Sequence, residues 1–238
     1  TENQQAKIDT NTVHAELLRL SADESPRVRF QVALALGNQT DTASVVALIS
    51  IARRDAADPW IVIAALSSSR ELDARLLDQV LQEPEFLSNA DNLPLLRQLA
   101  TVTGVQKNPE QLKGIGERLQ NLPAEVRSAP VIEGLLLALE EGLRRGGSRL
   151  SVLWSQTPAE SLLTERIQLA SQCVNDTAKS VEERLTALKV VSFGDASTIR
   201  KATAELLTTS QPAEIQTAVV KALAADQDES TAPTLLAA

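Results

Sequence analysis

The sequence predicts an all-α fold in which antiparallel helix pairs stack into an α-α superhelix, or α-solenoid. Apolar residues recur at three- and four-residue steps in many successive segments, which is the spacing of one helix face. Only 2% of the residues are aromatic, and tyrosine and methionine are absent, so the core must consist mainly of Leu, Ala, Val and Ile. Such a core favours close helix packing over a β-sandwich or barrel, and no alternating strand or hairpin turn is found.

Length and composition describe an ordered globular chain. Its 238 residues, of which 43% are hydrophobic, are enough for one large domain or two small ones, and a single domain over 1–238 is predicted. The absence of any methionine suggests a piece of a larger multidomain protein. No apolar run approaches the roughly 20 residues that span a bilayer, so we expect no membrane contact by this chain. A net charge of −8 argues against nucleic acid as a partner.

Helix starts are marked by a capping side chain directly before proline. The cap accepts a hydrogen bond from a free helix N–H, and proline lacks a donor at a position where none is needed. Four such pairs occur: Ser25-Pro26, Asp58-Pro59, Asn108-Pro109 and Thr157-Pro158. Four glycines are expected where helices end, namely Gly37, Gly104, Gly146 and Gly194.

These signals divide the chain into about six helix pairs. In order, the expected pairs are 12–22 with 26–37, 42–54 with 59–69, 72–82 with 91–104, 109–120 with 130–145, 158–174 with 180–192, and 196–208 with 212–225. Residues 228–238 are expected to begin a further helix. The segment 146–156 is an irregular connector, either a longer loop or a short extra helix that brings Trp154 into the core.

Two of the helices share a sequence pattern. PRVRFQVALAL (26–36) aligns with AEIQTAVVKAL (213–223), and the apolar positions match while an exposed position changes from Arg27 to Glu214. SADESPRVRFQVALALGN resembles a HEAT repeat of the short, HEAT-like kind, with an acidic turn, a proline, Val-Arg and an Ala/Leu helix. The resemblance implies that Asp23 and Arg29 belong to a polar ladder along the stack. The pattern is not kept in every pair. The equivalent positions hold Ala56 and Val62 in the second pair and Ser210 and Gln216 in the sixth, so the ladder is expected to be partial.

Residues 12–69 also resemble the HEAT region of planctomycete-type modular proteins. Those proteins often join a dehydrogenase-like domain to this region and end in a c-type cytochrome domain. The resemblance implies a spacer or docking platform in a redox protein and a periplasmic or exported location; otherwise a cytoplasmic location is expected. Haem would belong to a missing domain, because this chain has no Cys-x-x-Cys-His, and no cofactor is expected in the fragment itself.

The residues needed for common active sites are scarce. His14 is the one histidine and Cys173 the one cysteine, which excludes a His/Cys metal cluster and an intrachain disulfide. Cys173 is expected to be a buried thiol. The adjacent pairs Glu140-Glu141 and Glu182-Glu183 splay about 100° apart on a helix and are expected to face solvent. We therefore predict no catalytic and no metal-binding residue, and no enzyme activity in this chain.

A dinucleotide loop is also rejected for KGIGERL (113–119). No strand precedes it, Leu119 replaces the third glycine, and the glycines fall inside a helix pattern. Their expected role is close helix approach or a local kink.

Five residues are candidates for an interaction surface. Arg27 should face outward, and Trp60 either anchors an interface or packs between repeats. Arg144, Arg145 and Arg149 form the strongest basic cluster, which serves either a docking patch or the negative end of a helix dipole.

The predicted function is therefore a non-catalytic protein-interaction or spacer domain that contacts a protein partner or neighbouring domains of its own chain. The expected setting is between a dehydrogenase-like and a cytochrome domain. A stand-alone regulatory adaptor is the alternative. A HEAT-like DNA glycosylase would need a basic concave face with aromatic residues, which a net charge of −8 disfavours.

Overall fold

The chain is all-helical wherever its structure is described. The computed structural model describes residues 10–37, 39, 41–67, 76–127 and 130–224, and no strand occurs among them. Two compact units make up the structure, one formed by 1–106 with 122–142 and the other by 107–121 with 143–238. The all-α prediction is confirmed for this part of the chain, whereas a single domain over 1–238 stays a prediction.

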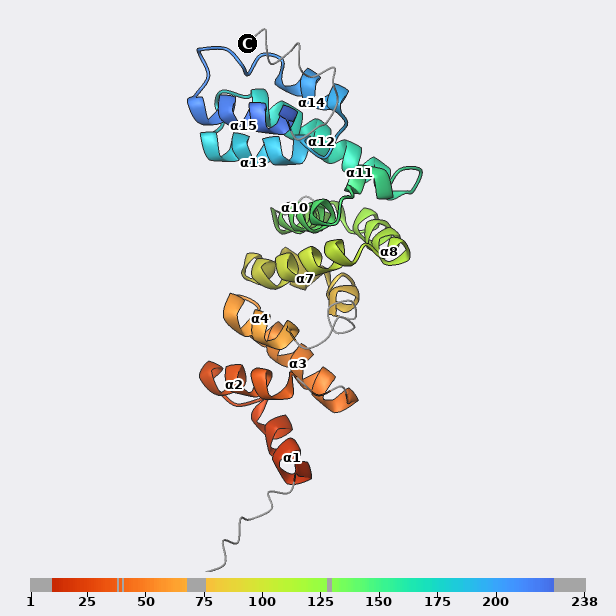
Figure 1. The fold of residues 1–238 in the computed structure, drawn as a ribbon, viewed down its shortest axis with the longest axis vertical. Helices are drawn as coiled ribbons and strands as arrows, with labels where there is room; N and C mark the ends of the chain where they lie inside the picture. Colours follow the sequence, from red (N-terminus) through yellow and green to blue (C-terminus); the bar gives the residue numbers. More distant parts are fainter. Residues whose placement is uncertain (1–9, 38, 40, 68–75, 128–129, 225–238) are drawn as a thin grey trace, which may run out of the picture. The chain divides into compact units, whose positions relative to one another are not determined.

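In the first unit, neighbouring helices pack in pairs and the pairs pack on one another (Figure 1). Helix α1 contacts α2, and α3 contacts α4, while α2 contacts α4 and α4 contacts α7. Residues 76–80 are helical as well. The elements of this unit are α1 (Thr10–Leu20), α2 (Pro26–Leu36), α3 (Thr42–Arg54), α4 (Pro59–Leu66), α6 (Pro84–Ser88), η1 (Ala90–Asn92), α7 (Leu93–Gln106), α9 (Ala124–Arg127) and α10 (Pro130–Arg145), the last up to Gly142.

The second unit repeats this mode of packing (Figure 1). Helix α12 contacts α13 and α14 contacts α15, while α12 also contacts α14 and α13 contacts α15. Helix α8 packs against α11 and α12. The bounds are α8 (Pro109–Gln120), α11 (Leu150–Leu153), α12 (Ala159–Asn175), α13 (Val181–Val191), α14 (Ala196–Thr203) and α15 (Ala213–Ala224).

Most predicted helix bounds agree with the structure to within two residues. Helices α3, α8 and α10 match their predicted ranges, and the connector 146–156 contains the short helix α11, which matches the second alternative for this segment. Trp154 follows it and is fully buried. The expected helix over 72–82 lies partly outside the described residues, and the one over 228–238 lies wholly outside them.

Two of the residues predicted to mark helix ends or starts do not do so. Gly104 lies inside α7 and is buried, and a Cβ on Gly142 of α10 would lie 3.0 Å from its Cα. Gly104 therefore serves close helix approach and not a helix end. Thr157 does not cap α12, because the helix begins at Ala159 with Pro158 in the cap position, and the Thr157 hydroxyl donates to the Trp154 carbonyl at 2.7 Å.

The other predicted caps differ in how they work. The Asp58 carboxylate accepts hydrogen bonds from the backbone N–H groups of Trp60 and Ile61, and the Asn108 side chain accepts one from Gln111. Ser25 has the extended backbone of a cap but makes no side-chain cap bond. A full capping box, which the sequence analysis did not identify, joins Ser180 and Glu183 at the start of α13.

The core has the predicted composition. Its buried side chains are almost all Leu, Ala, Val and Ile, and Trp154 and Phe193 are the largest fully buried ones in the described residues. Gly116 of α8 lets a large side chain fit, because a Cβ added there would overlap the Cβ of Ala159 and lie 3.0 Å from Cε2 of Trp154. Gly114 has open space around it, so of the two glycines in KGIGERL, Gly116 marks the close approach.

Candidate functional site

Arg29 is the best-connected polar residue of α2. Its side chain is buried, and it donates to both carboxylate oxygens of Asp55, at 2.7 Å from Nε to Oδ2, and to the backbone carbonyls of Asp23 and Glu24. The hydrogen bond to Asp55 raises the pKa of the Arg29 guanidinium. This arrangement anchors the end of α3 to the turn before α2.

Asp23 and Arg29, which the HEAT resemblance assigns to a polar ladder, contact each other through the backbone of Asp23. Asp23 meets Arg29 through its backbone carbonyl at 2.7 Å, while its carboxylate accepts from the backbone N–H of Ser25 at 2.8 Å. The ion-pair partner is Asp55, which caps the C-terminus of α3 beside the non-matching Ala56.

The second unit has a buried arginine at the position that corresponds to Arg29. We call such a residue, which holds the turn before its helix by hydrogen bonds, a polar anchor. Arg184 stands four residues after its cap Ser180, as Arg29 stands four residues after Ser25, and it is buried. It donates to the Val174 carbonyl at 2.8 Å and to the Gln211 side chain at 2.7 Å. The Ser-x-x-x-Arg spacing was visible in the sequence, but Arg184 was missed because its turn lacks the proline.

Gln216 of α15 takes the equivalent place with a different side chain. Its amide nitrogen donates to the Gln211 carbonyl five residues earlier, at 2.8 Å, and Arg29 likewise donates to the carbonyl of Glu24, five residues earlier. The turn before the helix is therefore held in the same way by an amide in place of a guanidinium.

The predicted basic cluster is used mainly inside the second unit. Arg144 and Arg149 both donate to the backbone carbonyl of Ser192, at 2.7 and 2.8 Å, where Ser192 caps the C-terminus of α13. Two cations at a helix C-terminus satisfy a terminal carbonyl and oppose the negative end of the dipole. Arg145 is exposed. Arg144 and Arg145 also lie in the last turn of α10, as the helix-dipole alternative expected, so the cluster serves the C-terminal ends of both helices.

The two tryptophans have opposite surroundings. Trp154 is 0% exposed and donates from Nε1 to the Leu112 carbonyl at 2.9 Å, whereas Trp60 is 73% exposed at the start of α4. Burial of Trp60 between repeats does not occur within the described structure. A large aromatic side chain left in solvent beside a hollow is the usual anchor of a protein interface.

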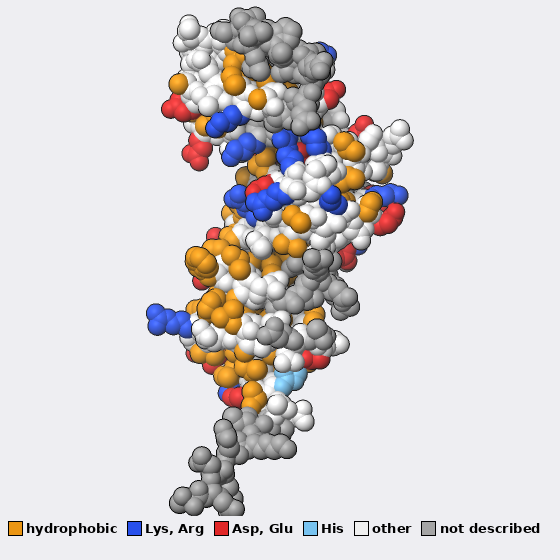
Figure 2. Space-filling view, in the orientation of Figure 1, with side chains coloured by type: hydrophobic (Ala, Val, Ile, Leu, Met, Phe, Trp, Pro, Cys, Tyr) orange, Lys and Arg blue, Asp and Glu red, His pale blue; other side chains and the backbone are white. Residues whose placement is uncertain are grey.

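A groove of about 320 Å³ lies beside Trp60, where α2 and α4 begin. Figure 2 shows hydrophobic side chains gathered over these helices, and Leu34 and Ile63 are among the exposed ones. Arg27 is exposed, as predicted. We call this the Trp60 groove; its lining residues are Pro26, Arg27, Phe30, Gln31, Asp58, Trp60 and Ile61.

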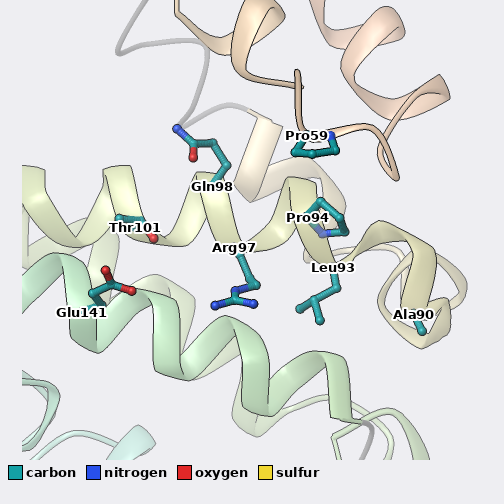
Figure 3. A pocket seen from close by; sticks show the side chains of 8 residues that line it. All are labelled: Pro59, Ala90, Leu93, Pro94, Arg97, Gln98, Thr101 and Glu141. Atoms are coloured by element: carbon teal, nitrogen blue, oxygen red, sulfur yellow. The ribbon is translucent and has the colours of Figure 1, made fainter. Parts of the chain in front are cut away.

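A second groove, of about 510 Å³, lies between Pro59 at the start of α4 and residues of α7. Figure 3 shows Pro59 near Pro94 at the groove and the Arg97 side chain extending from α7 toward α10. We call this the Arg97 groove; its lining residues are Pro59, Ala90, Leu93, Pro94, Arg97, Gln98, Thr101 and Glu141.

Each groove contains an exposed arginine that makes no polar contact with the other described residues. In the described part of the chain, every arginine except Arg27 and Arg97 takes part in a hydrogen bond, an ion pair or another electrostatic contact. The two arginines that are left over therefore line the two grooves on either side of the Asp58–Trp60 turn.

The residues considered for chemistry are dispersed. His14 links α1 to α3 through Ser44, at 2.8 Å from Nε2 to Oγ. Glu140 is buried, contrary to the prediction that it faces solvent, and Cys173 is half-buried and not fully buried. The described residues contain no group of three or more His, Cys, Asp or Glu side chains that could hold a metal ion.

Two further findings concern the chain as a whole. None of the helices in the described ranges has the length and apolar character needed to cross a bilayer. Comparisons with family models, curated proteins and solved structures find no match to this chain.

Proposed function

We propose that the chain is a non-catalytic helical-repeat platform that docks a protein partner or a neighbouring domain through the Trp60 groove. The observation that carries the proposal is Trp60 itself, 73% exposed beside an apolar hollow in a chain with two tryptophans. Trp is over-represented among the residues that dominate interface energies.

A HEAT-like superhelix of about six pairs is part of the same proposal. It is supported by helix packing that repeats along each unit, since first helices contact first helices and second helices contact second helices. It is also supported by side-chain hydrogen bonds that join residues at similar separations along the sequence. His14 to Ser44, Arg29 to Asp55, Arg53 to Glu83 and Arg184 to Gln211 each join residues 26 to 30 positions apart.

The proposed mechanism is geometric. The polar anchor Arg29 joins the turn before α2 to Asp55 at the end of α3, so the helix start that carries Arg27 and the turn that leads to Trp60 are held in place before a partner arrives. Preorganisation reduces the entropy lost on binding. The proposed setting, between a dehydrogenase-like and a cytochrome domain, rests on the resemblance of residues 12–69; an adaptor would use the same groove.

Site-specific photo-crosslinking tests the docking proposal. A photoreactive phenylalanine analogue is placed at position 60 of the gene product in the cells that make it, and at position 152 as a control, since Val152 is a 66% exposed apolar residue of the second unit. We expect a discrete protein adduct, or an intramolecular link to another domain, from position 60 alone. Identical adduct patterns from both positions would contradict the proposal.

A further inference from the structure

The unused arginines indicate which kind of partner the grooves fit. Arg27 and Arg97 are exposed and have no partner among the described residues. The carboxylates that line the same grooves are engaged, Asp58 by the backbone N–H groups of α4 and Glu141 by a contact that does not involve Arg97. A guanidinium presents a planar set of donors that matches a carboxylate with two parallel hydrogen bonds. Each groove therefore offers one carboxylate site beside apolar surface.

The two sites lie on either side of one exposed aromatic side chain. Pro59 lines the Arg97 groove, while Asp58 and Trp60 on either side of it line the Trp60 groove. Helix α4 packs against both α2, which carries Arg27, and α7, which carries Arg97. A segment that runs from one groove to the other passes the start of α4, where Trp60 is exposed.

We propose that the segment is an extended acidic peptide of a partner protein, apolar in its middle, with carboxylates on Arg27 and Arg97 and apolar side chains against Trp60. This rests on the proposed docking function and adds the chemistry of the ligand. Helices α2, α4 and α7 all begin at these grooves, and helix N-termini favour negative charge. The chain carries a net charge of −8, so an acidic segment is not attracted to the chain as a whole and needs particular cations such as Arg27 and Arg97 to bind.

A random 12-residue peptide library, displayed and selected on the immobilised chain, tests the proposal. We expect the recovered peptides to carry Asp or Glu on both sides of apolar or proline residues. Selection on the Arg27→Glu, Arg97→Glu double variant should lose these peptides, while a Lys113→Glu control keeps them. Lys113 is an exposed lysine of α8 in the second unit, so its reversal changes net charge equally per site.

Binding of one recovered peptide, labelled with fluorescein, is then measured by anisotropy. Each single reversal should weaken binding about tenfold or more, because a charge-assisted hydrogen-bonded pair is replaced by repulsion. Affinity should also fall as salt is raised. Circular dichroism verifies that the variants are folded, which is expected because neither arginine has a partner in the described part of the chain.

The outcomes separate the ligand's chemistry from the docking function. The inference is overturned if the recovered peptides are basic or neutral. It is also overturned if acidic peptides keep their affinity for the Arg27→Glu, Arg97→Glu double variant. If the binding of these peptides is still lost in the Trp60→Ala variant, the docking function stands although the inference about acidic ligands fails. If no peptide is recovered, the inference fails, and position-60 crosslinking decides the docking function separately.

Discussion

Arg29 shows how much one buried side chain holds together. It binds the carboxylate of Asp55 and the carbonyls of Asp23 and Glu24, so it joins the turn before α2 to the end of α3. Breaking a buried ion pair by removing one member leaves a charge without compensation, which costs about 3–5 kcal/mol.

We expect Arg29→Ala to lower the free energy of unfolding by an amount in that range, about 3–5 kcal/mol, in urea denaturation. Arg27→Ala, two residues earlier and without a partner among the described residues, is the matched control and should change stability by less than about 0.5 kcal/mol. Adding Asp55→Asn to Arg29→Ala should recover part of the loss, because the unpaired carboxylate is removed. Equal effects of the two alanine variants would show that the pair contributes nothing.

Two glycines of α8 provide a second test at the scale of single residues. Gly116→Ala should destabilise by about 1–3 kcal/mol, because the new methyl group overlaps Ala159 and crowds Trp154. Gly114→Ala, two residues away in open space, should be neutral or stabilise by up to about 1 kcal/mol through its higher helix propensity. Thermal unfolding of the two variants provides the comparison. If Gly114→Ala were the less stable variant, the close contact of Gly116 with Ala159 and Trp154 would be refuted.

At the scale of helices, the caps decide where elements begin. The Asp195 carboxylate accepts from the Thr198 N–H at 2.8 Å at the start of α14. Hydrogen bonding by Thr198 lowers the pKa of Asp195 below its usual value of 3.8. A carboxylate with a lowered folded-state pKa adds stability above the unfolded-state pKa, and that stability is lost as pH falls through the folded-state value.

Asp195→Asn therefore separates the hydrogen bond from the charge. Asparagine is an equally good cap, so the loss at pH 7 should be limited to the charge–dipole part, about 0.3–1 kcal/mol at low salt. The difference between wild type and variant should shrink toward zero as pH falls below about 4, as measured by denaturation at several pH values. A difference that does not change with pH would contradict the role of the charge.

Sequence reasoning predicted the helices well because its signals are local. Apolar spacing and Asp58-Pro59 or Asn108-Pro109 depend on neighbours within a turn or two, and the corresponding helices begin where expected. Gly104 was misjudged because a glycine that permits close packing of α7 and α10 has the same local surroundings as one that ends a helix.

The candidate site was only partly predictable for the same reason. Arg27 and Trp60 were identified as exposed candidates, but Arg97 could not be, since its lack of a partner depends on the residues that surround it in space. For Arg144 and Arg149 two alternatives stood open, a docking patch or a helix dipole, and the sequence could not indicate that the carboxyl end of α13, more than 40 positions along the chain, accepts their hydrogen bonds.

At the scale of the whole molecule, the division into two compact units has a measurable consequence. In repeat-like structures, a local defect lowers the stability of its neighbours before that of distant elements. Gly116→Ala should therefore speed amide hydrogen exchange in α8 and α12, which meet at Ala159, and leave α2, α3 and α4 unchanged. Hydrogen-exchange mass spectrometry resolves these helices. Uniform loss of protection over both units would indicate one cooperative domain.

The chain carries one tryptophan in each compact unit and no tyrosine. Because Trp60 is solvent-exposed already and Trp154 is fully buried, the change in intrinsic emission during unfolding arises almost entirely from Trp154. Fluorescence thus reports the second unit, while far-ultraviolet circular dichroism reports helices of both. Coincident midpoints from the two signals would mean that the units unfold together, and separated midpoints would give each unit its own stability without any added label.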